Sequence, residues 1–207
     1  MDARNIYTKI NERNKDMTAT KGKDTVTLGI RDLKISRITK DDENGVTYDT
    51  PVDVPGVKEI TIDLISDEKE LTGDGVILDT FTKKKGYEVS FKNAQLSQEI
   101  MDIINGTTTT ETGETGSKVY TTEDDNTNQA GYFALEFTPE HTVGEKDYHR
   151  ILYKVSGNYK EEYAEEDYMV CSFSGKGVAR TYDKKFGARK LYEAITDITQ
   201  IPAITKG

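Results

Sequence analysis

The fold class follows most directly from one segment, EITIDLISDEKELTGDGVILDTFTKKKGYEVSFK at residues 59–92. Apolar and polar residues alternate over residues 59–64 and again over residues 87–92, which is the period-2 pattern of half-buried strands. The intervening residues 66–86 are polar at both ends and carry two glycines near their middle, a composition typical of a turn region. The segment therefore predicts two strands joined by a long projecting hairpin.

The projecting hairpin carries apolar side chains that its own sheet cannot cover. Four of them would be exposed on a monomer, namely Leu71, Val76, Leu78 and Phe81. Exposed apolar surface and unpaired strand edges are liabilities unless another chain covers them. We therefore expect these four residues to lie in an interface between subunits.

The sequence on both sides of this segment predicts further strands. Apolar and polar residues alternate, or apolar residues cluster, at residues 28–38, 132–137, 149–155 and 168–173. After residue 177 strand and helix patterns compete, and strand is preferred. The polar tract 39–45, which ends in Asn-Gly, predicts a turn.

One short helix is expected beside the sheet. Ser97 offers an N-cap for a helix over residues 98–104, and Gly106 follows as the C-terminal stop. Three isoleucines of this segment share one helical face, so the helix should lie flat on the sheet.

Two segments do not fit the pattern of a core. Residues 1–24 show no alternation and predict an N-terminal arm that orders only against a partner. Residues 107–131 are rich in threonine, glycine and acids, and they predict an insert loop that is mobile or docked on a neighbour. Residues 25–207 are then expected to form a single domain. Its fold class is mainly β (α+β), a β-sandwich or barrel with one short flanking helix, a long projecting hairpin and an N-terminal arm.

Composition restricts the partners of the chain. Its 207 residues carry a formal net charge of −9, with 37 acidic against 28 basic residues. A net negative charge opposes binding to the phosphate backbone of a nucleic acid. No apolar run approaches the roughly 20 residues of a membrane span, so no membrane contact is expected. Cys171 is the only cysteine, which excludes an internal disulfide and predicts a small buried residue.

The sequence contains no recognisable pattern of catalytic residues. The only two histidines are His141 and His149, and neither lies in a serine-hydrolase or zinc-protease pattern. We expect both to be surface residues. Adjacent acids such as Asp41 and Asp42 are expected to be solvated loop charges rather than hydrolase carboxylates. The chain is therefore expected not to be an enzyme.

Two loop segments resemble ligand-binding motifs but lack residues that those motifs require. An Asp-x-Asn-x-Asn run at residues 124–128 matches the first ligand positions of a calcium loop, but Gln129 and Leu135 replace its turn glycine and bidentate glutamate. Residues 113–118 lack the Gly-Lys pair of a phosphate loop. We expect neither a metal nor a cofactor.

Three stretches of the chain together carry a family resemblance. They are LGIRDLKISRITKDDENGVTYDTPVDVPGVKEITIDL at residues 28–64, KKKGYEVSFKNAQLSQEIMDIING at residues 83–106, and GYFALEFTPE with YHRILYKVSGNYKEEYAEEDYMVCSFSGKGVAR within residues 131–180. In this combination the chain resembles the major tail proteins, or tail tube proteins, of siphophages that infect Gram-positive bacteria, of the phi13 type. The N-terminal arm and the insert 107–131 fit the resemblance least.

The resemblance implies a tail-tube-type β-sandwich and a structural virion protein. Six copies would form a ring, and stacked rings would form a hollow tube that conducts genomic DNA into the host during ejection. The implied partners are further copies of the chain, the tape measure protein, the tail terminator and the distal tail protein. The implied location is the tail of the virion, after assembly in the host bacterial cytoplasm. We also expect acidic side chains to face the lumen, because a basic wall would hold DNA by counterion release.

Two other interpretations stay open. One is a monomeric β-sandwich that binds a ligand or glycan, which would show a concave aromatic face and one defined pocket. The other is the tube subunit of a contractile injection system. Concentration-dependent polymerisation would separate the first alternative from a tube subunit.

Overall fold

The computed structural model describes most of the chain, in the ranges 26–27, 29–94, 97–123, 129–139, 141–143, 146–163 and 170–193. The expected N-terminal arm at 1–24 and the calcium-loop pattern at 124–128 lie outside the described residues. No helix among the described residues is long and apolar enough to cross a membrane.

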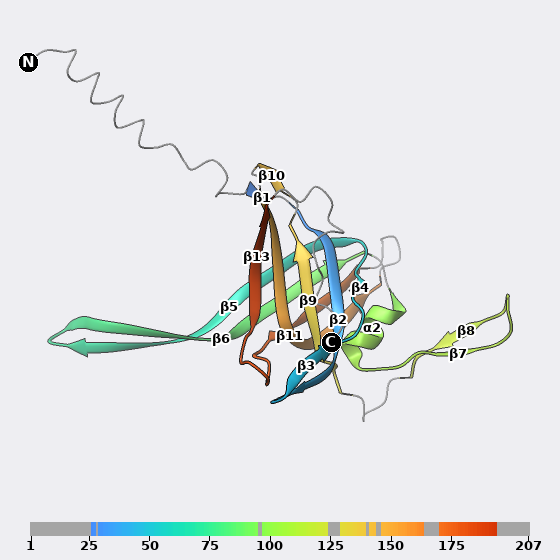
Figure 1. Ribbon diagram of the computed structural model, residues 1–207, viewed down its shortest axis with the longest axis horizontal. Coiled ribbons are helices and arrows are strands. Elements are labelled where there is room, and N and C mark those ends of the chain that lie inside the picture. The colour runs from blue at the N-terminus through green and yellow to red at the C-terminus, as the bar shows by residue number, and fades with distance from the viewer. Residues whose placement is uncertain are drawn as a thin grey trace, which may run out of the picture.

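The described residues form a mainly β protein with one helix, as predicted (Figure 1). The first half contains β1 (Val26–Thr27), β2 (Arg31–Asp42), β3 (Gly45–Tyr48), β4 (Val52–Asp53), β5 (Val57–Gly73), β6 (Val76–Asn93) and α2 (Gln98–Asn105). The second half contains β7 (Thr110–Thr112), β8 (Val119–Thr121), β9 (Phe133–Thr138), β10 (His141–Val143), β11 (Lys146–Glu162), β12 (Val170–Gly177) and β13 (Gly187–Glu193).

A nine-stranded antiparallel sheet dominates the fold. Its main path runs β3-β2-β9-β11-β12-β6-β5, with β4 paired to β2 and β13 paired to β11. The long strand β11 joins two parts of this sheet, because its first half pairs with β13 and its second half pairs with β12 along the same edge. One part is therefore β3-β2-β9-β11-β13, and the other is the four-stranded part β11-β12-β6-β5.

The two parts of the sheet enclose a single hydrophobic core. Phe173 of β12 stacks on Phe91 of β6 at 5.0 Å and meets Phe133 of β9 edge-on at 5.4 Å between ring centroids. Side chains of β2, β11 and α2, together with Val54, complete the cluster. The sheet must bend sharply for β9 and β12 to meet in this way, and Gly157 and Gly175 lie opposite each other at the bend. A Cβ on Gly157 would lie 2.3 Å from a backbone oxygen of β12, so only glycine fits there.

Helix α2 confirms the prediction for residues 98–104 with one more residue at its end. Its three isoleucines at positions 100, 103 and 104 are buried against the sheet, as expected. Gly106 ends the helix in the left-handed conformation, with φ of 72°. The expected cap was wrong in one respect, because the Ser97 side chain makes no capping hydrogen bond.

Two sequence-based boundaries were wrong. The turn expected at residues 39–45 is shorter, because β2 continues to Asp42 and β3 begins at Gly45. The Asp42 carboxylate accepts the N–H of Asn44 at 2.8 Å and so closes a tight turn at the end of the hairpin. The insert 107–131 is also not a plain loop, since β7 and β8 pair within it.

Candidate assembly interface

The β5–β6 hairpin projects far beyond the rest of the sheet, as predicted (Figure 1). Leu71, Val76, Leu78 and Phe81 all lie on this projection and are between 57% and 63% exposed. Ile77 beside them is equally exposed and was not among the predicted residues. A two-stranded ribbon in water is marginally stable on its own. The proposed cover by a neighbouring subunit remains a prediction.

The four-stranded part of the sheet has one apolar face and one polar face. Its inner face packs into the core, with Phe91 and Phe173 each 1% exposed. Its outer face presents twelve polar side chains in three rows across the four strands, which we call the polar face. Its members are Glu59, Thr61 and Asp63 of β5, Glu88, Ser90 and Lys92 of β6, Ser172, Ser174 and Lys176 of β12, and Ser156, Asn158 and Lys160 of β11.

The polar face is electrically balanced and open. It contains three acidic residues and three lysines, and the Glu59 carboxylate lies 3.5 Å from the Lys92 ammonium. A hollow of about 510 Å³ crosses its centre, between Thr61 on β5 and Asn158 on β11. None of the residues that line this hollow is aromatic. A glycan-binding site usually offers an aromatic surface for the sugar ring, so the hollow gives that interpretation little support.

Two edges of the four-stranded part carry unpaired backbone groups. Within the described part of the chain, β5 pairs only with β6. In the same part of the chain, β11 pairs beyond Val155 only with β12. Such edges are templates for pairing with another chain.

A second hairpin, β7–β8, leaves the body on the side away from the β5–β6 hairpin (Figure 1). Residues 110–121 are all exposed, including Val119 and Tyr120. Its base is tied to α2, because the Asp102 carboxylate accepts the Thr107 hydroxyl at 2.8 Å and the Thr109 N–H at 2.9 Å. The β7–β8 hairpin therefore has a hydrogen-bonded base and exposed strands, where the sequence had predicted a loop.

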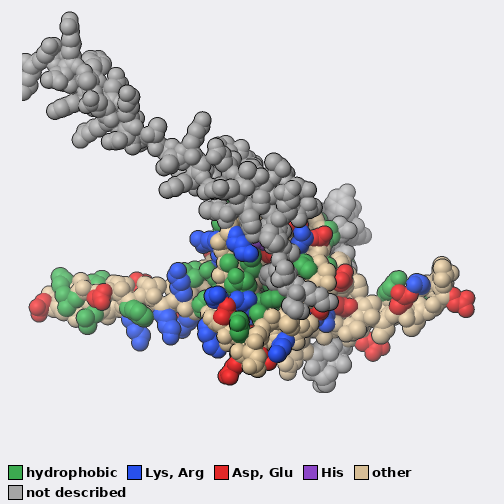
Figure 2. Space-filling view, in the orientation of Figure 1, with side chains coloured by type: hydrophobic (Ala, Val, Ile, Leu, Met, Phe, Trp, Pro, Cys, Tyr) green, Lys and Arg blue, Asp and Glu red, His purple; other side chains and the backbone are tan. Residues whose placement is uncertain are grey.

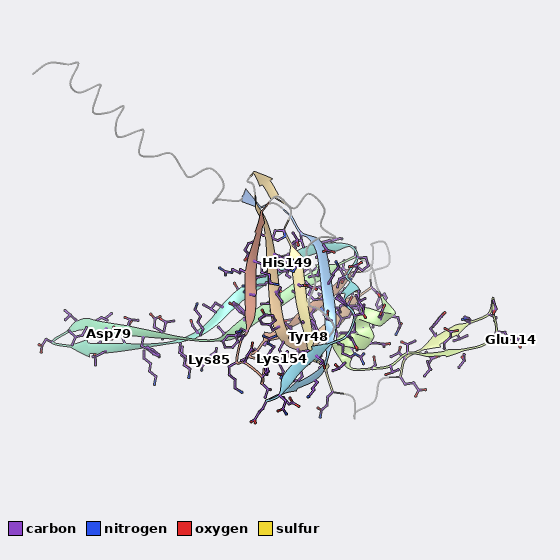
Figure 3. All side chains as sticks on the ribbon, in the orientation of Figure 1. Tyr48, Asp79, Lys85, Glu114, His149 and Lys154 are labelled. Carbon is purple, nitrogen blue, oxygen red and sulfur yellow. The ribbon has the colours of Figure 1, made fainter. Side chains whose placement is uncertain are left out.

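His149 is a correction to the sequence-based expectation of a surface residue. Its side chain is 2% exposed, with Nε2 at 3.1 Å from the Glu136 carboxylate and Nδ1 at 2.9 Å from the Thr138 hydroxyl. Figure 3 places it within the body of the sheet. The order hydroxyl, imidazole, carboxylate is that of a hydrolytic triad. Thr138 and Glu136 are, however, 0% and 1% exposed, so no substrate can reach this hydroxyl and the group acts as a structural hydrogen-bond chain.

Asp41 is a second correction, because it is a buried ion-pair partner and not a solvated loop charge. Its carboxylate is 5% exposed and accepts a hydrogen bond from Lys154 Nζ at 2.7 Å. The backbone N–H of Thr181 donates to the same carboxylate at 2.9 Å. Next to it, the Arg180 guanidinium lies 3.7 Å from the centre of the Tyr153 ring. These contacts fasten the segment before β13 to the β2–β3 hairpin.

The remaining sequence-based candidates do not converge on a site. The His141 side chain lies outside the described residues. Residues 113–118 form the turn between β7 and β8, as the N–H of Ser117 donates to the carbonyl of Glu114 at 2.9 Å. Among the described residues, no group of three or more potential ligands could hold a metal ion. Cys171 is fully buried, as expected.

Comparison of the sequence with protein-family models and with curated proteins found no match.

Proposed function

We propose that this chain is a tail tube protein of a long-tailed phage, a structural subunit that assembles into stacked hexameric rings through which genomic DNA passes. The observation that carries the proposal is the four-stranded part of the sheet, with one polar face and two edges that no described strand pairs with. The family resemblance of the sequence points to the same function.

The strand count of this part suits ring formation. In an antiparallel sheet of four strands, the two edge strands run in opposite directions. The β5 edge of one copy therefore meets the β11 edge of the next copy in the antiparallel sense, with every polar face on the same side. Six copies would give a barrel of roughly 24 strands, more than the roughly 16–18 strands that already enclose an aqueous channel.

The polar face is suited to line such a channel. Net positive charge would bind DNA by counterion release, and apolar side chains would be exposed to water. A wall of Ser, Thr and Asn with equal numbers of acids and lysines does neither. The proposed lumen is therefore neutral, which replaces the acidic wall expected from sequence.

The β5–β6 hairpin gives the ring a second contact. Leu71, Val76, Leu78 and Phe81 would be covered by an adjacent copy, so assembly would bury the exposed apolar side chains of the hairpin. The tape measure, tail terminator and distal tail proteins are the further partners, and the virion tail is the location that this function implies.

The decisive test is negative-stain electron microscopy of the purified protein at increasing concentration. Rings or tubes with a central bore are expected. Substituting serine for the four hairpin residues Leu71, Val76, Leu78 and Phe81 should abolish them without unfolding the monomer, because these side chains are more than half exposed and take no part in the core. The matched control replaces Thr72, Thr80 and Thr82 of the same hairpin by serine.

Two results would contradict the proposal, one in part and one as a whole. Tube formation by the four-serine variant equal to that of the unmodified chain would refute the hairpin contact and leave the tube function standing. A monomer at every concentration and salt level, even with the distal tail protein added as initiator, would overturn the tube function itself. That second result would favour a monomeric binding module, whose candidate site is the hollow on the polar face.

A further inference from the structure

The tip of the β5–β6 hairpin is acidic as well as apolar. Residues 68–82 contain four acids, Glu68, Glu70, Asp74 and Asp79, against the single basic residue Lys69. All fifteen residues except Gly73 are exposed. Asp67, just before the tip, is neutralised within the same copy by Lys85 at 2.5 Å. A surface that covers this tip must therefore be apolar and also bring positive charge.

One surface of the described body has both properties. Residues 184–190 carry four exposed basic side chains, namely Lys184, Lys185, Arg189 and Lys190. The single acid next to them, Asp183, pairs with Arg180 at 2.5 Å and with Lys185 at 3.3 Å, which leaves Lys184, Arg189 and Lys190 as the main positive charges of this surface. The turn before them exposes the apolar side chains of Val178 and Tyr182. We call residues 178–190 the basic edge, because β13 pairs only with β11 among the described strands and leaves its other edge unpaired.

The basic edge lies where the hairpin of the same copy leaves the body. Phe186 meets Tyr87 at 6.5 Å between ring centroids, and a Cβ on Gly86 would touch the Gly177 carbonyl. Lys83 and Lys84 at the hairpin root extend the basic surface, and Figure 2 shows lysine and arginine side chains gathered there. The hairpin points away from the body, so its tip cannot reach the basic edge of its own copy (Figure 1).

The length of the hairpin suits a contact with another copy. Nine residues of β5, from 65 to 73, extend past the last pairing of β6 with β12, at Tyr87 and Gly177. At about 3.3 Å for each residue this projection spans roughly 30 Å, the width of a small domain. A tip at that distance can cross an adjacent copy.

We propose that the hairpin tip of one copy docks on the basic edge of a second copy. The acids of residues 68–82 would face the bases of residues 184–190, while the apolar tip residues cover Val178 and Tyr182. The contact is head-to-tail, because tip and edge are different surfaces of the same chain, and it leads to rings or filaments rather than to closed pairs. This inference rests on the proposed assembly function and names the surface that receives the hairpin.

Charge exchange between two variants tests the contact. The acidic variant carries Lys184→Glu, Lys185→Glu, Arg189→Glu and Lys190→Glu, so its tip and its edge are both negative. The basic variant carries Glu68→Lys, Glu70→Lys, Asp74→Lys and Asp79→Lys, so both of its surfaces are positive. Each variant alone should need about a tenfold higher concentration to assemble, whereas an equimolar mixture should assemble by alternating the two.

Sedimentation velocity and electron microscopy of the two variants and their mixture give the readout. Circular dichroism first establishes that each variant is folded, which the exposed positions of all eight substitutions favour. Added salt should weaken the wild-type contact and the mixed contact alike. Assembly of either variant alone at the wild-type concentration would overturn the contact while leaving the tube proposal intact.

Two further outcomes separate this inference from the tube proposal. Mixed variants that form heterodimers or short chains without ever closing a bored ring would support the contact and contradict the tube. Loss of duplex DNA binding in the acidic variant, with assembly unchanged, would instead identify the basic edge as a nucleic-acid surface and refute docking of the hairpin.

Discussion

The buried Asp41 carboxylate defines how the stability of this fold should respond to acid. Burial by itself raises the pKa of this carboxyl, but the hydrogen bond from Lys154 and those from the N–H groups of Thr181 and Tyr182 outweigh it. The pKa is thereby lowered from 3.8 to about 2. These partners belong to β11 and to the segment before β13, so the charge of one carboxylate connects three parts of the chain.

The size of the effect follows from the shift in pKa. Each pKa unit corresponds to about 1.4 kcal/mol, so the lowered pKa of Asp41 contributes about 2 kcal/mol to the free energy of unfolding. Because the pKa is lower in the folded state, this contribution is complete above about pH 4 and is lost as the pH falls toward about 2. Asp41→Asn removes the charge and leaves Lys154 without its partner. We expect the variant to be less stable by about 2 kcal/mol at neutral pH and similar to the wild type near pH 2.

Urea unfolding at several pH values measures this difference directly. Circular dichroism is the suitable signal, because the chain has no tryptophan. Asp74→Asn is the matched control, since Asp74 is exposed at the turn of the β5–β6 hairpin and should not change stability at any pH. A difference between wild type and Asp41→Asn that is absent at neutral pH, or that stays the same size in acid, would refute the argument.

Three further predictions concern the body of the fold. Arg180→Ala should lower the free energy of unfolding by about 2 kcal/mol, because it removes the guanidinium from the Tyr153 ring and from a buried ion pair, and urea unfolding would measure this. Gly157→Ala should lower the melting temperature by several degrees, because its Cβ would meet the backbone of β12, whereas Gly45→Ala, with open space around it, should not; calorimetry compares the two. Cys171 should react with a thiol reagent only as fast as the protein unfolds, since it is fully buried, and rapid labelling of the folded protein would contradict this.

The features that sequence predicted well are those encoded locally. The β5–β6 hairpin and the burial of the α2 isoleucines follow from alternation and helical spacing over a few residues. Local patterns also led to errors in the predicted boundaries of strands. The polar residues that end β2 looked like a turn, yet they extend the strand because β3 pairs with them on an exposed ribbon. The β7–β8 hairpin was missed for a similar reason, since its strands have three residues each.

The features that sequence did not predict depend on contacts between distant segments. His149 is buried because register places it opposite Thr138, and Glu136 lies two residues away on the same face of β9. Asp41 is buried because Lys154, more than a hundred residues later, reaches it. No periodicity within one strand reveals such partners. The polar face was missed in the same way, because its polar residues look like the solvent side of any antiparallel sheet until four strands align them in rows.

The two contacts proposed for assembly would have complementary roles. Backbone pairing between the β5 and β11 edges supplies hydrogen bonds but does little to fix the register of the two strands. A slip of two residues keeps every side chain on the same face of the sheet. On the polar face such a slip would change only exposed contacts, such as those between Glu59 or Asp63 of β5 and Lys160 of β11, and exposed ion pairs contribute little to stability. Docking of the hairpin tip on the basic edge would be specific, since it joins particular charges and apolar residues of two copies. A long acidic hairpin is then the feature that fixes the register of an otherwise tolerant edge, which explains why a tube subunit would keep so much exposed apolar surface before assembly.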